Sequence, residues 1–484
     1  MSEMQVSDRD IAPLRPREHR YPISIVPGAL AAIDLLLILF VALQTCNYFV
    51  ILNDDLRGQY IFAAAFVGFV TLLLFQRAGL YDLDAIMRPL RFSDAIIAGI
   101  ATSFLFLLTI VFSLNVAGAY NLDWLMAFAV LSAATIIGAR FLICAVLLRL
   151  ARSGRIGRSL VVLGGGEQAR RFLTRINDVK PYFTSVIAVY ADETEGHVDE
   201  LAGYRIVGGS DRLLSDVRAG LIDDIVIALP WNEDLKLVAI VEQLKEMPVN
   251  VHISSDLVGF RLRFRPVLGS LSNLSMFEVE RKPIAGWSSL LKSVEDYVFA
   301  GAALLALSPL LLLVAIAIKI DDPDGPVFFM QKRLGFNNQV FEIYKFRSMY
   351  QNAGEEETVR QATKGDPRVT RVGRFIRATS IDELPQLLNV LNGSMSLVGP
   401  RPHALSHNEE YGRQIRGYFT RHKVKPGITG WAQVNGLRGE TEALELMEAR
   451  IRHDIYYAEN WSLLFDLRIL ATTVFVILFQ KSAY

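Results

Sequence analysis

The sequence predicts a membrane protein of mixed class, with α-helical parts and an α/β part in one chain of 484 residues. Three observations support this prediction. Long apolar runs fill much of residues 23–150, and 52% of all residues are hydrophobic. Short apolar runs alternate with helical stretches between residues 151 and 283. A further long apolar segment, interrupted by a proline, opens the last part of the chain.

The composition sets limits on size and function. A length of 484 residues exceeds one ordinary core, so two or more domains are expected. Lys and Arg total 50 and Asp and Glu total 50, so no basic surplus suggests nucleic-acid binding. The mean hydropathy is +0.31. Cys46 and Cys144 both lie in apolar runs, and the sequence contains neither a disulfide framework nor a zinc motif.

Residues 23–150 are predicted to form four transmembrane helices. The preceding residues 1–22 are polar and rich in Arg and Pro, so we expect a disordered cytoplasmic lead. The first apolar run is too long for the core of a signal peptide and is interpreted as an uncleaved span. Each span is near the ~20 residues needed to cross a bilayer. The spans are drawn at about 26–50, 60–76, 96–114 and 124–148.

Charges in the loops orient these spans. Arginines gather in the lead, in the loop after the second span and after the fourth span, whereas the opposite side carries only Arg57 and several acids. The positive-inside rule therefore puts both ends of the block in the cytoplasm. Asp34 and Arg140 lie deep in the first and fourth spans at matching depth. Because unpaired charges in lipid are costly, we predict a buried ion pair, with separate polar partners as the alternative.

Residues 151–283 are predicted to form a Rossmann-like, CoA-binding-like α/β domain. Strands are expected at 159–163, 185–190, 224–229 and 249–253, with helical stretches between them. The turn Gly164-Gly165-Gly166-Glu167-Gln168-Ala169 has the G-x-G-x-x-A spacing of dinucleotide sites. However, the first acid after the second strand, Asp192, comes late for a ribose contact, and no Tyr-x-x-x-Lys pair occurs. We therefore interpret the domain as a structural or regulatory module.

The apolar segment 297–320 is expected to enter the membrane and return. Lys292 precedes it, and Lys319 and Lys332 stand at and beyond its end, so both flanks look cytoplasmic. Ser308-Pro309 interrupts the segment near its centre and predicts a helix–break–helix. The backbone groups freed by the break would be satisfied inside the protein or by Ser308. A fifth true span is the alternative.

Two adjacent carboxylates, Asp382 and Glu383, stand before an apolar helix in the stretch 379–391. Four arginines surround them in the sequence: Arg371, Arg374, Arg377 and Arg401. Helix N-termini and guanidinium groups hold phosphate, and a carboxylate can act as nucleophile or metal ligand, which favours phosphoryl chemistry.

A structural interpretation of the same stretch is also open. Ser380 and Glu383 fit the Ser-x-x-Glu capping box of a helix N-terminus. Alternatively, Asp382 caps the helix, which would place Pro385 in the first turn, where proline is tolerated. From the spacing alone, capping and catalysis are equally supported.

Several motifs follow one another in the last part of the chain. They are Gln331-Lys332-Arg333-Leu334-Gly335, Tyr344-Lys345-Phe346-Arg347-Ser348-Met349, the arginine and acid stretch 366–391, Val398-Gly399-Pro400-Arg401-Pro402 and Lys425-Pro426-Gly427-Ile428-Thr429-Gly430-Trp431. This succession, over about 290–484, resembles the polyisoprenyl-phosphate hexose-1-phosphate transferases, the bacterial sugar transferase family. The resemblance implies a monotopic, α-rich catalytic domain at 284–484 with a re-entrant membrane helix at 297–320.

The resemblance also implies a reaction. In this family a UDP-hexose gives its sugar-1-phosphate to undecaprenyl phosphate on the cytoplasmic leaflet, UMP leaves, Mg²⁺ is required and a covalent intermediate forms. Large members with a similar front part start exopolysaccharide, O-antigen or capsule repeat units. Glucose is the first expectation for the sugar, with galactose as the alternative.

Residue roles follow from the resemblance by position. Asp382 would attack the β-phosphorus, and Glu383 would help to hold the metal or the attacking group. The remaining assignments are Lys345 and Arg377 to catalysis, Arg401, Arg374 and Arg347 to substrate binding, Asp454 with Asp382 and Glu383 to the metal, and Ser308 and Pro309 to the re-entrant break. Asp454 and Asp466 are matched less securely than the others, to family acids with structural or metal roles.

The expected partners are UDP-hexose, undecaprenyl phosphate and membrane lipid, with a homodimer as one mode of assembly and no nucleic acid. The expected location is the bacterial inner membrane, with the catalytic domain on the cytoplasmic face. The apolar tail 461–479 is long enough for a sixth crossing but is expected to form an amphipathic or interfacial helix, or one packed against a partner subunit. Two other functions stay open: a membrane-tethered nucleotide-sugar dehydratase or epimerase, and a non-enzymatic scaffold for polysaccharide export.

Overall fold

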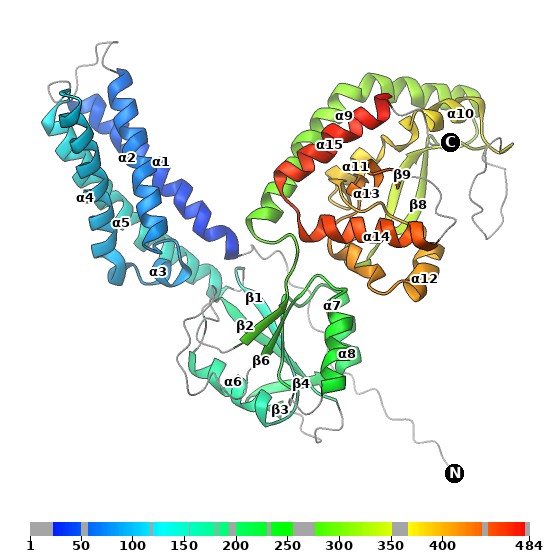
Figure 1. The fold of residues 1–484 in the computed structure, drawn as a ribbon, viewed down its shortest axis with the longest axis horizontal. Helices are drawn as coiled ribbons and strands as arrows, with labels where there is room; N and C mark the ends of the chain where they lie inside the picture. Colours follow the sequence, from blue (N-terminus) through cyan, green and yellow to red (C-terminus); the bar gives the residue numbers. More distant parts are fainter. Residues whose placement is uncertain are drawn as a thin grey trace.

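The computed structural model describes residues 23–49, 57–116, 120–153, 155–179, 181, 183–192, 200–229, 234–254, 276–350, 366–437 and 444–479. Figure 1 shows three parts: a group of long helices, a sheet with helices beside it, and a part in which helices surround two small sheets. The predicted disordered lead, 1–22, lies outside the described residues.

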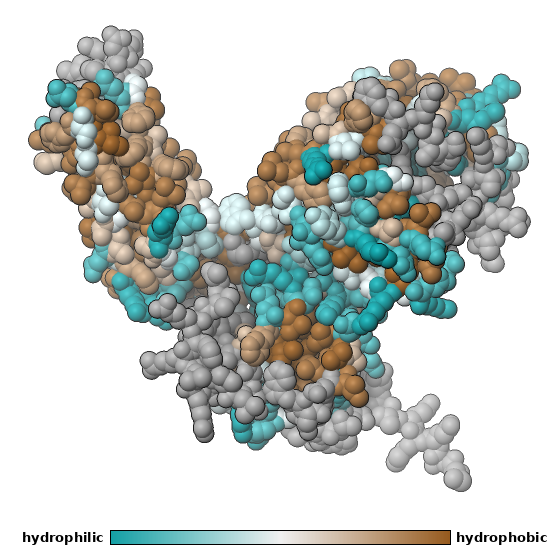
Figure 2. All heavy atoms as spheres, in the orientation of Figure 1, coloured by the Kyte–Doolittle hydropathy of each residue, from teal (hydrophilic) through white to brown (hydrophobic). Residues whose placement is uncertain are grey.

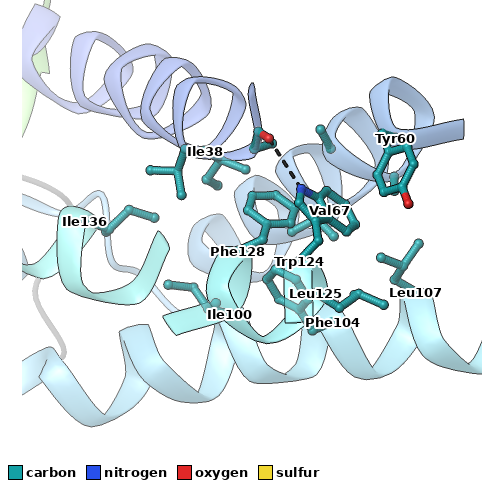
Figure 3. Packing of buried hydrophobic residues seen from close by; sticks show 14 of the residues in the cluster. Ile38, Tyr60, Val67, Ile100, Phe104, Leu107, Trp124, Leu125, Phe128 and Ile136 are labelled. Atoms are coloured by element: carbon teal, nitrogen blue, oxygen red, sulfur yellow. Dashed lines mark hydrogen bonds between the residues drawn. The ribbon is translucent and has the colours of Figure 1, made fainter. Parts of the chain in front are cut away.

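Four long helices form the first part, where four spans are predicted. They are α1 (Val26–Phe49), α2 (Arg57–Arg77), α4 (Pro89–Ser113) and α5 (Leu122–Arg152), accompanied by the short η1 (Ile23–Ile25) and α3 (Leu83–Met87). All four are long and apolar enough to cross a membrane. The rings of Trp124, Phe128 and Phe104 pack inside the bundle (Figure 3). Leu36 and Phe40 face outward, and Figure 2 shows the bundle surface as largely hydrophobic. This distribution suits a bundle surrounded by lipid.

The predicted ion pair inside the bundle is confirmed. Arg140 of α5 lies 2.6 Å from Asp34 of α1, and both side chains are almost fully buried. The Tyr81 hydroxyl also donates to Asp34, at 3.1 Å, and Arg140 donates to the carbonyl oxygen of Leu80, at 3.2 Å. The pair thus connects the first and last helices of the bundle to the loop between α2 and α3, which supplies the additional hydrogen bonds that a buried charge needs.

The second part is the predicted α/β domain. Its sheet has seven strands in the order β3-β4-β2-β1-β5-β6-β7. The central five are parallel and follow the doubly wound order, with the chain crossing from one side of β1 to the other, and β3 and β7 join the edges antiparallel. The strands are β1 (Arg158–Leu163), β2 (Thr184–Tyr190), β3 (Glu200–Leu201), β4 (Tyr204–Gly208), β5 (Asp224–Ile227), β6 (Asn250–Ser254) and β7 (Met276–Glu280), and the helices are α6 (Glu167–Val179), α7 (Ser210–Arg218) and α8 (Asp234–Leu244).

The glycine-rich turn of this domain has a packing role. Gly164 has a φ of +137°, and a Cβ there would lie 2.5 Å from the carbonyl oxygen of Ala228, so only glycine fits. Asp192, the acid considered for a ribose contact, accepts a hydrogen bond from the backbone N–H of Ser210 at 2.8 Å and pairs with Lys236 at 3.0 Å. This carboxylate therefore caps α7 and fixes α8, in agreement with a structural module.

The third part opens with α9 (Trp287–Asp321), a helix of 35 residues that curves along one side of this part (Figure 1). The expected helix–break–helix is wrong in one respect: the helix runs on through Pro309 without interruption. A proline at this position leaves the carbonyl oxygen of Leu305 without its usual N–H donor. The Ser308 hydroxyl donates to that oxygen at 2.8 Å, so the predicted use of Ser308 is confirmed and the helix bends rather than ends.

Two small sheets and a set of short helices complete this part. The hairpin of β8 (Phe328–Leu334) and β9 (Val340–Phe346) is antiparallel, and β10 (Ser396–Val398) pairs in parallel with β11 (Gly427–Thr429). The helices are η5 (Phe336–Asn338), α10 (Arg371–Ala378), η6 (Ile381–Glu383), α11 (Gln386–Leu391), α12 (Leu405–Gln414), η7 (Tyr418–Lys423), α13 (Trp431–Val434), α14 (Leu444–Glu459) and α15 (Leu463–Phe479).

Buried charges attach α9 to the rest of this part. Lys292 of α9 lies 2.6 Å from Asp466 of α15 and 3.2 Å from Asp296. Asp296 in turn accepts hydrogen bonds from the Ser396 hydroxyl and the Leu397 N–H of β10, both at 2.9 Å. The apolar tail predicted at 461–479 is therefore a helix packed on the third part through Asp466, and α9 has a fixed direction relative to β10.

The second and third parts meet through polar groups. The Asn337 side chain donates to the carbonyl oxygens of Val217 and Arg218, at 3.1 and 2.8 Å. Lys423 of η7 pairs with Glu280 of β7 at 2.6 Å, and its side chain is only 3% exposed. Among the described residues, the hydrophobic clusters of these two parts share no member.

Candidate active site

The acid pair lies in the single turn η6, between α10 and α11. Thr370 caps α10 by accepting a hydrogen bond from the Gly373 N–H at 2.8 Å. After α10 the chain reverses at Ser380, whose φ of +58° and ψ of +16° are left-handed. A non-glycine residue in that conformation costs about 1–3 kcal/mol, which is typical of functional sites. Asp382 and Glu383 follow directly on this strained residue.

The two structural interpretations of this stretch are wrong. Ser380 makes no side-chain cap hydrogen bond, and α11 begins only after Pro385, which occupies its N-cap position. Glu383 points to cations from other elements instead of back to Ser380. The hydrogen bonds of Glu383 with these cations are stronger than one with a backbone N–H, because charge-assisted hydrogen bonds are about twice as strong as neutral ones.

Glu383 is held by two cations. Lys345 of β9 lies 2.9 Å from its Oε1, and Arg401 donates to both carboxylate oxygens, at 2.6 and 3.1 Å. This is a two-pronged guanidinium contact that fixes the plane of the carboxylate. Against the penalty of burial, Arg401 and Lys345 hold the pKa of Glu383 well below its usual range. Glu383 therefore stays ionised and anchors the turn.

Asp382 has the opposite environment. Among the described residues, no hydrogen bond or ion pair engages its carboxylate. Burial and the adjacent Glu383 raise the pKa of Asp382 to about 6, against the opposing effect of Lys345, Arg377 and Arg401. Two neighbouring carboxylates with pKa values pushed apart indicate different roles. The carboxylate of Asp382 is available to bond to a substrate, whereas Glu383 could do so only by losing its contacts with Lys345 and Arg401.

Asn389 is a site residue that the sequence did not reveal. From α11 its side-chain oxygen accepts a hydrogen bond from the Tyr344 N–H at 2.9 Å, and its side-chain nitrogen donates to the Glu342 carbonyl oxygen at 2.7 Å. Both contacts are on β9, beside Lys345. Asn389 thus joins the strand that carries Lys345 to the helix that follows the acid pair. Residue patterns within a short stretch of sequence do not predict a contact between such distant segments.

Arg333 is the second unrecognised residue. It ends the Gln331-Lys332-Arg333 motif on β8, and a backbone bridge to Ala404 brings it beside the Pro400-Arg401-Pro402 loop. Burial and the like charge of Arg401 lower the pKa of Arg333 to about 10. The sequence shows Arg333 as part of a basic motif. Its place in the site, however, depends on the backbone bridge to Ala404, which the sequence does not show.

The other predicted residues divide into two groups. Arg377 is half-buried and its charge acts on Asp382, while Arg374 of the same helix is exposed. Arg347 is buried and engaged by Asp322, with one nitrogen 2.5 Å from the carbonyl oxygen and another 3.3 Å from the carboxylate. Asp454 is buried in an ion pair with Arg421 at 2.8 Å. The structure thus gives Arg347 and Asp454 partners of their own within the protein.

The expected metal was tested against the side chains present. Among the described residues, no group of three His, Cys, Asp or Glu side chains forms a metal-binding cluster. Both oxygens of Glu383 contact cations, while the carboxylate of Asp382 is open. Mg²⁺ commonly uses one or two carboxylates together with substrate phosphates. The open carboxylate of Asp382 fits that mode, and Glu383 would join it only by giving up a contact with Lys345 or Arg401.

Comparison with known proteins agrees with this geometry. Residues 287–480 match the family described as "Bacterial sugar transferase", and residues 76–255 match that described as "CoA-binding domain". The chain is 36% identical to the UDP-glucose:undecaprenyl-phosphate glucose-1-phosphate transferase of Escherichia coli K12, over 88% of this chain and 91% of that protein. It is 42% identical to the protein of the same name from Xanthomonas campestris, over 59% of each chain. It is 52% identical to that of Caulobacter vibrioides, over 40% of this chain and 72% of that protein. The chain therefore belongs to the bacterial sugar transferase family and is a sugar-phosphate transferase.

Proposed function

We propose that this chain transfers hexose-1-phosphate, in the first place glucose-1-phosphate, from a UDP-hexose to undecaprenyl phosphate with release of UMP. The names of the relatives support both substrates. The observation that carries the proposal is the open Asp382 carboxylate beside Glu383, which Lys345 and Arg401 hold. The reaction would be the first membrane step in the synthesis of exopolysaccharide, O-antigen or capsule repeat units.

The proposed mechanism has two displacements at the same phosphorus. First, an oxygen of Asp382 bonds to the β-phosphorus while the bond from that phosphorus to the bridging oxygen breaks, and UMP leaves with that oxygen. Second, an oxygen of undecaprenyl phosphate bonds to the phosphorus, and the bond to Asp382 breaks. Splitting the transfer in this way lets one carboxylate face each substrate in turn.

The remaining groups of the site would stabilise charge. Arg377 and Arg401 would offset the negative charge of the phosphates as UMP leaves, and Lys345 would keep Glu383 fixed beside the reacting atoms. When bound, Mg²⁺ would neutralise charge on the diphosphate, and Asp382 and Glu383 are the side chains that would hold it. Arg374 would reach phosphate from the exposed side of α10.

An apolar pocket supports a lipid acceptor. It has a volume of about 430 Å³, and its lining comes from α9 and α10: Leu313, Val314, Ala317, Arg371, Val372, Phe375 and Ile376. α10 lines the pocket as far as Ile376 and ends four residues before Asp382. We assign the pocket to the first units of the prenyl chain, because its walls are apolar and its rim carries Arg371.

We further propose that α1, α2, α4 and α5 cross the inner membrane and that α9 enters from the cytoplasmic face and returns. Much of α9 is exposed and apolar, and Figure 2 shows hydrophobic surface along it. The bend at Pro309 and the buried Lys292–Asp466 contact support an oblique, shallow position. A lipid phosphate at the bilayer surface would then lie at the level of the acid pair. Assembly as a homodimer stays a prediction.

This topology predicts a labelling pattern. A cysteine introduced at the exposed Thr379 should be protected from a membrane-impermeant maleimide in intact spheroplasts and react after permeabilisation. A cysteine at the exposed Leu122, at the outer end of α5, should react in intact spheroplasts. The native Cys46 and Cys144 are buried. Labelling of Thr379→Cys from outside would mean that α9 is a fifth crossing.

The proposed function predicts the substrate requirements of the purified chain. Repeated turnover of UDP-glucose with UMP release should require both undecaprenyl phosphate and Mg²⁺, whereas without the lipid at most one UMP per chain should be released as the covalent intermediate forms. A panel of other UDP-sugars would define the sugar. Turnover of a UDP-sugar without the lipid and with bound NAD(H) would indicate a dehydratase or epimerase instead. No turnover with any UDP-sugar in the panel would contradict the proposal and favour a scaffold.

The pKa of Asp382 predicts the pH dependence of the first step. Because the folded-state pKa is raised to about 6, the reactive carboxylate is present above that pH and lost below it. The kcat/KM for UDP-glucose should fall about tenfold per pH unit below pH 6, while Glu383 stays ionised. An acidic limb near the ordinary aspartate value of about 4 would show that Asp382 is not the titrating group.

A further inference from the structure

Arg333 has no acidic partner among the described residues, although it lies close to the acid pair. Arg333 donates to the side-chain oxygen of Gln331 at 2.5 Å. Its Nε is buried and makes no hydrogen bond within the described residues, and none of their carboxylates forms an ion pair with it. Glu383 cannot serve this purpose, because Lys345 and Arg401 already occupy both of its oxygens. A buried cation in this situation is costly unless an anion joins it.

The position of Arg333 identifies the anion. The backbone bridge from Arg333 to Ala404 brings Arg333 beside the loop that carries Arg401. Burial and the like charge of Arg401 lower the pKa of Arg333. Glu383 is paired with Lys345 and Arg401, so the charge of Arg333 is left uncompensated by the described carboxylates. A diphosphate carries two negative charges on neighbouring phosphorus atoms and matches the pair of Arg333 and Arg401.

The donor and the acceptor approach the acid pair from different elements. The apolar pocket lies between α9 and α10. Arg333 and Arg401 instead belong to the β8–β9 hairpin and the loop before α12, and β8 packs against α12. A lipid phosphate anchored in the pocket would therefore approach Asp382 along α10, whereas Arg333 and Arg401 reach the acid pair from other elements.

We propose that Arg333, together with Arg401, binds the diphosphate of the sugar nucleotide and has no part in binding the lipid acceptor. This inference rests on the proposed function, since it assigns one of its two substrates to one side of the site. It gives the Gln331-Lys332-Arg333 motif a role: Gln331 orients the guanidinium, and Arg333 selects a donor that carries a diphosphate.

The test compares Arg333→Met with Lys332→Met in the full-length protein in nanodiscs. Lys332 is the exposed neighbour on the same strand, so its substitution removes the same charge outside the site. We expect Arg333→Met to raise the KM for UDP-glucose by about 10- to 100-fold, the loss typical of a charged hydrogen bond, with an unchanged KM for undecaprenyl phosphate. Arg333→Lys should recover part of the loss, and Lys332→Met should behave as the unmodified chain.

Direct binding separates this inference from the proposed function. In the Asp382→Asn background, calorimetry with UDP-glucose should give a Kd that Arg333→Met weakens by a similar factor. An unchanged Kd, or a rise only in the KM for undecaprenyl phosphate, would overturn the role of Arg333 while the transferase reaction stands. Absence of UMP release by the unmodified chain would instead overturn the proposed function, and the Kd comparison would still decide on Arg333.

Discussion

Asp382→Asn is expected to lower UMP release from UDP-glucose by on the order of 10⁴-fold or more, as is typical when a nucleophile is removed. The amide keeps the shape of the side chain but cannot form the bond to phosphorus. The unfolding temperature should stay the same or rise, because burial and Glu383 disfavour the ionised Asp382. UMP release and thermal unfolding measured on one preparation would check both results.

The control for this experiment is Asp324→Asn. Asp324 is an exposed acid in the loop after α9, so the substitution removes the same charge from the same part of the chain. We expect it to leave activity unchanged. Full turnover by Asp382→Asn would exclude the covalent mechanism, and an equal loss in Asp324→Asn would show that the assay reports net charge rather than the site.

Asp34→Asn is expected to destabilise the helical bundle by about 3–5 kcal/mol, the usual cost of breaking a buried pair from one side. It leaves Arg140 buried at 3% exposure without its carboxylate. The hydrogen bond from Arg140 to the Leu80 carbonyl oxygen would remain, but a neutral acceptor compensates only part of the charge. Denaturant-induced unfolding in detergent micelles, followed by the fluorescence of Trp124 in a variant whose other four tryptophans are replaced by Phe, would measure the loss.

A double substitution distinguishes the pair from its members. Asp34→Leu with Arg140→Leu removes both charges, so it should be less destabilising than either single change. Asp123→Asn, at the exposed start of α5, is the matched control and should have no effect. If Asp34→Asn and Arg140→Gln both left stability unaltered, the ion pair would have no structural role.

The features that the sequence predicted well have local causes. Each membrane helix follows from about twenty apolar residues, and each central strand from a short buried run, because neighbours along the chain decide both. The contact between Asp34 and Arg140 is distant in sequence, yet lipid offers so few polar partners that matching depth was enough. The sequence correctly predicted that Pro309 disturbs α9. Because the Ser308 hydroxyl bonds to the carbonyl oxygen that the proline leaves without a donor, the helix bends there and does not break.

The sequence singled out the acid pair, and the structure leaves the carboxylate of Asp382 open, but the contacts that hold the pair were not predicted. The capping box failed because Glu383 has partners 38 and 18 residues away in Lys345 and Arg401, and spacing near a helix end contains no information on them. Arg347 looked like a phosphate ligand, although Asp322 engages it inside the protein. Asn389 and Arg333 become part of the site only through contacts between distant segments, where β8, β9, α11 and the loop before α12 come together.

The polar join between the α/β sheet and the third part has an evolutionary consequence. Contacts such as Asn337 with Val217 and Lys423 with Glu280 can be replaced by water when the sheet is removed. Within the part of the chain that the structure describes, no apolar cluster shared by the two parts would be exposed by such a loss. Recombination can therefore add, remove or exchange the gene segment that encodes the sheet without changing the segment that encodes the transferase domain.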